Sequence, residues 1–127
     1  ILSGLTMQEC FAYTQRARLN ITPLMPNDNV TATGQVTIVN TMNMGKMLIS
    51  SDCNGVDDYM IHNETGWLIP PKSADAIAEA VDLLWHDDEL RNRLNAGAKS
   101  YALAHYSDES AGRNLVRILD ELAADYR

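Results

Sequence analysis

The chain has 127 residues, of which 46% are apolar and 21% are charged, and its net charge is −7 with a pI near 4.7. This length fits one domain with a modest core, and the acidic balance excludes a basic nucleic-acid groove or an anionic membrane surface as the main partner. No apolar run approaches the roughly 18 residues of a membrane-spanning helix, and the first residues lack a signal-peptide pattern.

Two helices are expected in the first 45 residues. A capping-box pattern, with Thr6 as N-cap and Glu9 three residues later, predicts a helix over residues 7–17. A second helix is expected over residues 34–44, followed by Gly45 in the position where a helix commonly ends. The apolar side of this second helix is formed by Val36, Val39, Met42 and Met44.

Short apolar runs between turn residues predict three strands. They cover residues 19–23, 47–50 and 67–69. A loop over 24–32 follows the first strand, and a turn at 53–56 with one or two helical turns over 57–61 follows the second. Because strands and helices alternate, we expect an α/β fold with a parallel sheet and right-handed crossovers.

The remainder of the chain has helical periodicity. Three helices are expected, with N-caps at Ser73, Asp87 and Ser107. The residues expected to face inward are Ala74, Ile77, Ala78, Val81, Leu84 and Trp85 in the first helix, Leu90, Leu94, Ala98 and Tyr101 in the second, and Ala111, Leu115, Ile118, Leu119 and Leu122 in the third. The acids that follow each cap complement the positive end of the helix, so we interpret them as structural rather than catalytic.

Ligands of parallel sheets bind in the loops after the carboxyl ends of the strands. The long loop before residue 34 ends at a helix start, where the backbone N–H groups of Gly34, Gln35 and Val36 would point toward an anion. Gly34 would allow a phosphate to approach closely. Since many α/β loops contain one glycine, the alternative is an ordinary link between a loop and a helix.

Other candidates for chemistry are weaker. The two cysteines, Cys10 and Cys53, lack metal-ligand spacing, so we expect buried free thiols in a reducing, cytoplasmic compartment. The three histidines, His62, His86 and His105, lie far apart in sequence, and we expect no metal site. No nucleophile elbow, Walker A motif or zinc motif occurs, and no residue is predicted to be catalytic.

Two longer stretches match one family pattern in register. Residues 34–71, GQVTIVNTMNMGKMLISSDCNGVDDYMIHNETGWLIPP, contain its glycine, apolar helix, small-Met-x-x-Gly-Lys turn, apolar strand, Gly-Val-x-Asp-Tyr turn and Gly-x-Leu-Ile-Pro segment. Residues 74–107 match its helical tail. The chain resembles the C-terminal, nucleotide-sugar-binding domain of GT-B glycosyltransferases of family 4, also called group 1. The resemblance covers residues 1–127 as a single domain.

This resemblance implies a partial Rossmann-like domain: a short parallel sheet flanked by helices, with a helical C-terminal tail. It also implies that a nucleotide sugar of unknown base is bound as the donor substrate, with no further cofactor. The diphosphate would lie at Thr33, Gly34, Gln35 and Val36. The nucleobase would lie near the loop that contains Gly4, Leu5 and Thr6, and the turn with Asn54, Gly55 and Asp58 would approach the sugar or the phosphate.

Two acidic positions of the family are occupied by uncharged residues in this chain. The carboxylate that binds the ribose hydroxyls corresponds to Asn40, and the carboxylate near the transferred sugar corresponds to Ala32. The Arg and Lys that neutralise the leaving diphosphate, and the acceptor-binding domain, would both precede Ile1. We therefore expect a fragment of a longer protein that is inactive as this isolated chain.

Two functions remain open at this point. The first is the donor-binding part of an enzyme that transfers a sugar from a nucleotide sugar to an acceptor such as a saccharide or lipid-linked glycan, as in polysaccharide biosynthesis. The alternative is a degenerate, non-catalytic module that acts through oligomerisation or partner binding. Because the first two strands of the usual sheet would be missing, the strand at 19–23 would have a bare edge. We expect a second copy or another chain to cover that edge, and the missing N-terminal domain is a further expected partner.

Overall fold

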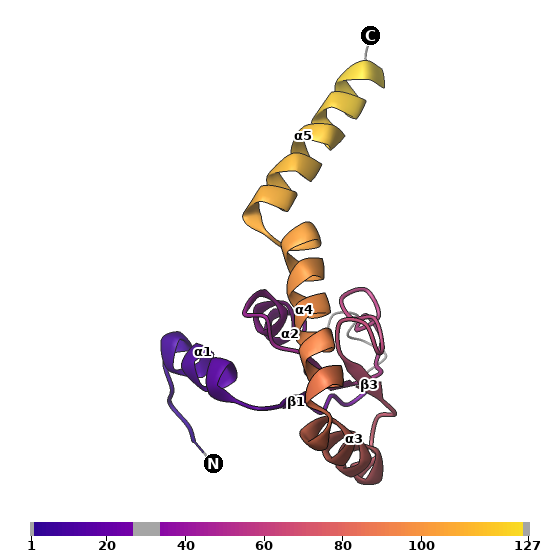
Figure 1. Ribbon diagram of the computed structural model, residues 1–127. Helices are drawn as coiled ribbons and strands as arrows, with labels where there is room; N and C mark the ends of the chain where they lie inside the picture. The colour runs from indigo at the N-terminus through magenta and orange to yellow at the C-terminus, as the bar shows by residue number, and fades with distance from the viewer. Residues whose placement is uncertain (1, 27–33, 126–127) are drawn as a thin grey trace.

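The computed structural model describes residues 2–26 and 34–125 (Figure 1). The helices are α1 (Met7–Arg16), α2 (Gln35–Asn43), α3 (Ala74–His86), α4 (Asp88–His105) and α5 (Asp108–Asp125). The strands are β1 (Asn20–Thr22), β2 (Leu48–Ser51) and β3 (Trp67–Ile69). Their order along the chain is the predicted one. Among the helices in this part of the chain, none combines the length and apolarity that crossing a bilayer requires.

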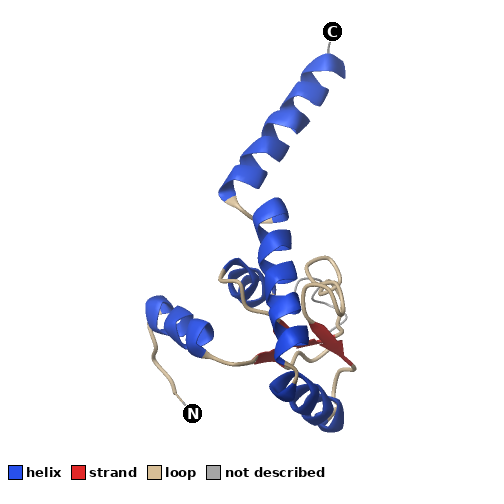
Figure 2. Ribbon diagram, viewed as in Figure 1, coloured by secondary structure: helices blue, strands red, loops and turns tan. Residues whose placement is uncertain are grey.

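The three strands form one parallel sheet in the order β1-β2-β3 (Figure 2). Ile21 of β1 is paired with Ile49 of β2, and Ser50 of β2 is paired with Leu68 of β3. This sheet, flanked by helices and followed by a helical tail, confirms the expected α/β class. Since β1 pairs only with β2 among the described strands, its other side is an edge of the sheet.

Two apolar clusters lie on the two faces of β2. Leu48 belongs to a cluster with α2, the segment after β2 and the second half of α4, whereas Ile49 belongs to a cluster with β3, α3 and Leu94 of α4. Successive side chains of a strand point to opposite faces, so a central parallel strand is buried on both sides. All four residues of β2 are buried accordingly.

The predicted helix caps are confirmed. Thr6 and Glu9 form both halves of the capping box of α1. The side chains of Ser73, Asp87 and Ser107 accept hydrogen bonds from N–H groups in the first turns of α3, α4 and α5. Each of these bonds satisfies a donor that a helix leaves without a partner in its first turn.

The segment over residues 57–61, where one or two helical turns were predicted, forms hydrogen-bonded turns and does not continue as a helix. One i to i+4 bond, from Met60 N to Val56 O at 2.9 Å, is present. The next amide, that of Ile61, donates instead to Thr65 Oγ1 at 2.9 Å. The side chain of Thr65 therefore takes the donor that a continuing helix would need, and the chain turns toward β3.

The inward face predicted for α5 is wrong. Its apolar residues are exposed, and only Ser110 of this helix is buried. Figure 1 shows α5 extending away from the sheet beyond the end of α4. Periodicity predicts an apolar face, but burial also needs a surface for that face to cover, and the described chain offers α5 only the end of α4.

Five further side chains differ in exposure from the prediction, and two of them are Ala74 and Ala78 of α3, which are exposed rather than inward. Val36 and Trp85 are exposed rather than inward, and Arg18 covers the Trp85 ring at 5.0 Å from the ring centroid. Cys53 is buried as expected, and burial raises the pKa of its thiol. Cys10 is exposed, because α1 buries none of its side chains.

Candidate functional site

The start of α2 is a helix N-terminus that begins at a glycine. Gly34 is the N-cap, with φ +75°, and no side chain of the described residues caps the helix there. A Cβ at this position would lie 3.2 Å from the Leu24 side chain, so both the backbone conformation and the space favour glycine. The first N–H groups of α2 have no intrahelical acceptors, and the helix dipole makes this end positive.

A hollow of about 260 Å³ opens beside this helix start. It is lined by Gln35, Val36, Val39, Asn40 and Tyr59. Four of these residues come from α2, and Tyr59 comes from the connection between β2 and β3. The exposure of Val36 is explained by its place in the wall of this hollow.

The structure thus brings together three residues of the predicted diphosphate and ribose site. Gln35, Val36 and Asn40 line the same hollow, directly after Gly34. Asn40 is half-buried and uncharged, so it can form hydrogen bonds with a hydroxyl group but adds no negative charge. Thr33 and Ala32 lie outside the described residues. The assignment of these residues to a nucleotide sugar stays a prediction.

Tyr59 and Val39 line this hollow, although sequence reasoning assigned neither to the site, and Tyr59 alone of the lining residues comes from outside α2. The Tyr59 hydroxyl donates to Gln35 Oε1 at 2.8 Å. Its ring lies 5.5 Å, centroid to centroid, from that of Tyr106 at the end of α4. The residue stands in the Gly-Val-x-Asp-Tyr turn, but that pattern alone does not indicate which way the ring points. The wall that it forms depends on tertiary contacts.

Tyr106 holds the backbone of the segment that carries Tyr59. Its hydroxyl donates to the carbonyl oxygen of Asp58 at 2.7 Å. Burial, with a smaller contribution from Tyr101, raises the pKa of Tyr106 to about 12. The hydroxyl therefore stays protonated at neutral pH and remains a donor to this carbonyl.

The loop predicted to lie near the nucleobase does not line this hollow. Gly4, Leu5 and Thr6 precede α1, and Thr6 is used to cap that helix through Glu9. The hydrogen bond from the Thr6 backbone N–H to the Glu9 carboxylate lowers the pKa of Glu9. The role of this loop in base binding stays a prediction.

The turn with Asn54 and Gly55 lies in the same connection as Tyr59. Both Asn54 and Asp58 are exposed, and Gly55 has φ +82°. The backbone carbonyl of Asp58 accepts a hydrogen bond from the Tyr106 hydroxyl, and Asp58 itself is exposed. None of these three residues lines the hollow beside α2, so their approach to the sugar or phosphate also stays a prediction.

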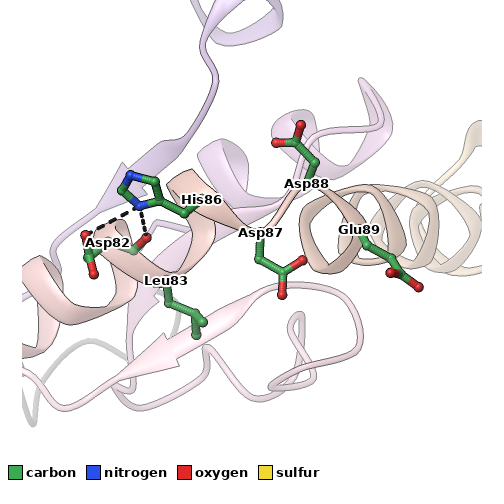
Figure 3. A pocket seen from close by; sticks show the side chains of 6 residues that line it. All are labelled: Asp82, Leu83, His86, Asp87, Asp88 and Glu89. Carbon is green, nitrogen blue, oxygen red and sulfur yellow. Dashed lines mark hydrogen bonds and ion pairs between the residues drawn. The ribbon is translucent and has the colours of Figure 1, made fainter.

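A broader acidic hollow lies where α3 meets α4 (Figure 3). Its lining residues are Asp82, Leu83, His86, Asp87, Asp88 and Glu89. Asp87 caps α4, Asp88 is paired with Arg91 and Arg18, and His86 Nδ1 lies 2.9 Å from the Asp82 carbonyl. Structural contacts therefore account for Asp87 and Asp88. Over residues 2–26 and 34–125, no group of three or more His, Cys, Asp or Glu side chains could hold a metal ion.

A third hollow lies at the carboxyl ends of β2 and β3. It is lined by Asp52, His62, Leu68, Ile69, Pro70 and Pro71. His62 Nδ1 accepts a hydrogen bond from the Leu68 backbone N–H at 3.0 Å, and its ring packs on Trp67 at 4.6 Å between centroids. We interpret His62 as a structural residue that fixes the start of β3.

Comparison with known proteins relates most of this chain to one family. The family model described as "Glycosyl transferases group 1" matches residues 13–101. An alpha-D-kanosaminyltransferase of Streptomyces kanamyceticus is 34% identical over 87 residues, which are 68% of this chain and 22% of that protein. The chain therefore spans less than a quarter of the length of this relative.

Solved structures show the same fold at low sequence identity. A sucrose-phosphate synthase from Thermosynechococcus elongatus has a TM-score of 0.78 at 20% identity, covering 98% of this chain and 30% of its own. The Anabaena protein Alr3699/HepE, in complex with UDP, has a TM-score of 0.72 at 16% identity over 85% of this chain and 29% of its own. The C-terminal domain of a group 1 family protein (LpcC) from Francisella tularensis has a TM-score of 0.71 at 17% identity, covering 85% and 53% of the two chains.

Proposed function

Because this chain belongs to the group 1 glycosyl transferases, we propose that it is the nucleotide-sugar-binding part of an enzyme that transfers a sugar to an acceptor such as a saccharide or lipid-linked glycan. The observation that carries the proposal is the overlap of two findings. The family match over residues 13–101 contains every residue of the hollow beside α2. The UDP complex of the similarly folded Anabaena protein supports a nucleotide as the ligand.

In this proposal, the start of α2 binds the diphosphate. The N–H groups of Gln35 and Val36 donate to phosphate oxygens, and Gly34 leaves room for them. Asn40 lies further along the same wall and accepts or donates hydrogen bonds at the ribose hydroxyls. In this proposal, these residues bind and orient the donor.

Calorimetry with UDP and GDP tests the proposal. We expect the chain to bind one of them in the micromolar to millimolar range and to bind uridine or guanosine more weakly, because helix N-termini favour anions. Val36→Glu places a negative charge in the hollow and should abolish binding. Val116→Glu is the matched control, since Val36 is 62% exposed and Val116, on α5, is 59% exposed.

The proposal fails if the wild-type chain binds neither diphosphate, or if Val36→Glu and Val116→Glu bind as well as the wild type. Binding that Val116→Glu alone removes would place the site on α5 and would also contradict it. A far-UV circular dichroism spectrum of each variant checks that the helices are retained.

A degenerate, non-catalytic module is the second candidate function. It is favoured by Asn40, which is neutral where the family pattern has a carboxylate, and by the edge of β1, where Ile21 is 40% exposed. In this case, the edge pairs with a second copy or another chain. Light scattering, which measures the oligomeric state, discriminates the two when it is combined with the calorimetry. A stable dimer that binds no nucleotide favours the module, and a monomer that binds a nucleotide favours the donor site. The cytoplasmic location stays a prediction.

A further inference from the structure

We infer that Tyr59 is a positioning residue that holds the Gln35 side chain with its amide nitrogen turned toward the bound diphosphate. This inference rests on the proposed function and deepens it, because it assigns a side chain to an anion site that otherwise consists of backbone N–H groups. The two residues come from different parts of the fold, α2 and the connection after β2. They meet in the wall of one hollow.

The chemistry of the amide gives the hydrogen bond its direction. Glutamine has one oxygen that accepts and one nitrogen that carries two donors. Tyr59 donates to Gln35 Oε1 at 2.8 Å, so the oxygen is already engaged. The amide nitrogen takes no part in this bond, so its two N–H donors remain for a ligand, which suits the oxygens of a phosphate.

Tyr59 is itself held in place by the end of α4. Its ring is half-buried and lies 5.5 Å from the Tyr106 ring, and the Tyr106 hydroxyl bonds to the carbonyl of Asp58, the neighbouring residue. The Tyr59 hydroxyl therefore reaches Gln35 from a fixed support. Ordering a side chain before the ligand arrives reduces the entropy lost on binding.

A purely stabilising role explains this bond less well. The Tyr59–Gln35 bond lies at the surface, where water competes for both groups, so its contribution to folding is small. Gln35 is exposed and stands in the first turn of α2, where its side chain is not needed to bury apolar surface. The effect of the bond should therefore appear in ligand binding rather than in thermal stability.

A double-mutant cycle on the full chain tests the inference, with UDP and GDP as the probes. We expect Tyr59→Phe to weaken binding of the diphosphate about five- to tenfold, the scale of one lost hydrogen bond between neutral groups. Gln35→Ala should weaken it by a similar factor, and Tyr59→Phe should add nothing when Gln35 is already Ala. Tyr13→Phe, at an exposed tyrosine of α1, is the matched control and should bind as the wild type does.

Gln35→Glu gives an independent check. Tyr59 can still donate to one carboxylate oxygen, but the other oxygen then faces the phosphate, so binding should be weaker than in Gln35→Ala. A merely structural role for Tyr59 would lower the melting temperature and would persist in the Gln35→Ala background, which the cycle detects.

The outcomes separate this inference from the proposed function. If the wild type binds a diphosphate and Tyr59→Phe binds it equally well, or if the loss in Tyr59→Phe is unchanged when Gln35 is Ala, then the inference is wrong and the donor site stands. If the wild type binds neither diphosphate, then the proposed function is wrong and the inference fails with it.

Discussion

The consecutive helices α4 and α5 have the same length of 18 residues but different surroundings. Both begin with acidic residues after a side-chain cap, and both have apolar residues at helical spacing. α4 buries Leu94, Ala98 and Ala102, whereas the apolar face of α5 is exposed. The difference teaches that an amphipathic pattern indicates which face of a helix is apolar but does not indicate which surface, if any, buries that face.

The same contrast separates the body of the chain from its two terminal helices. We call residues 20–105 the body, and α1 and α5 the terminal helices. α1 buries no side chain and α5 buries only Ser110, whereas both apolar clusters lie in the body. The likeness to sucrose-phosphate synthase covers 98% of this chain, so the shared fold extends to α5, which lies beyond the matched sequence of residues 13–101.

The largest expected effect comes from removing one leucine side chain from each helix. Leu94→Ala should lower the free energy of unfolding by about 2–5 kcal/mol, because Leu94 is fully buried against α3 and β2. Leu119→Ala, at a residue that is 55% exposed on α5, should change it by less than about 0.5 kcal/mol. Urea unfolding measures both. Equal losses would show that α5 is as well packed as α4.

The second comparison is between one arginine of α4 and one arginine of α5. Arg91 is buried and donates to the Leu84 carbonyl at the end of α3 at 2.7 Å, so Arg91→Met should cost about 1–3 kcal/mol. Arg117 is exposed and paired with Glu121 at 2.7 Å along α5, and Arg117→Met should cost less than about 0.5 kcal/mol. Raising the salt concentration should affect the Arg117 pair more. A larger loss in Arg117→Met than in Arg91→Met would contradict this account.

One glycine in each helix gives a third comparison, with opposite signs. A Cβ on Gly97 of α4 would lie 2.2 Å from the Glu64 carbonyl oxygen, so Gly97→Ala should cost about 1–3 kcal/mol. A Cβ on Gly112 of α5 would have no neighbour within 4 Å among the described atoms, so Gly112→Ala should stabilise the helix by about 0.5–1 kcal/mol. Measuring the helix content of Gly112→Ala by circular dichroism checks this stabilisation. If Gly97→Ala is tolerated, then α4 does not approach the turn before β3 so closely.

The smallest effect concerns pH at the junction of α3 and α4. The hydrogen bond from Arg91 lowers the pKa of the exposed Asp88 carboxyl, and Arg18 adds to it. A carboxyl with a lowered pKa in the folded state stabilises the fold above its ordinary pKa, and this contribution is lost as the pH falls through the lowered value. In Asp88→Asn, the free energy of unfolding should therefore fall slightly less as the pH is lowered than it does in the wild type. An Asp88 titration in the ordinary range, followed by NMR, would contradict it.

Local signals predicted most of this fold. Caps, glycines and strand runs indicated the order of the elements and the parallel sheet, because such signals act within a few residues. The helical turns expected over 57–61 end after one i to i+4 bond, because Thr65, from outside the segment, takes the Ile61 amide. The burial of α5 was also wrong, because it depends on a surface that the described chain does not supply.

The candidate site was predicted only along one helix. Gln35, Val36 and Asn40 follow Gly34 in sequence, so one local pattern indicated all of them. Tyr59 is 24 residues from Gln35 along the chain and reaches it through the fold, which no local pattern predicts. Sequence reasoning therefore misses the side chains that reach a site from a different segment of the chain.

The most direct test of the central claim is an NMR titration of the ¹⁵N-labelled chain with UDP and with GDP. The claim predicts saturable shifts of the Gln35 and Val36 backbone amides and of the Asn40 side-chain amide with one of the two nucleotides, while the amides of α5 stay unchanged. The absence of saturable shifts with either nucleotide, or shifts confined to α1, α5 or the acidic hollow between α3 and α4, would contradict it.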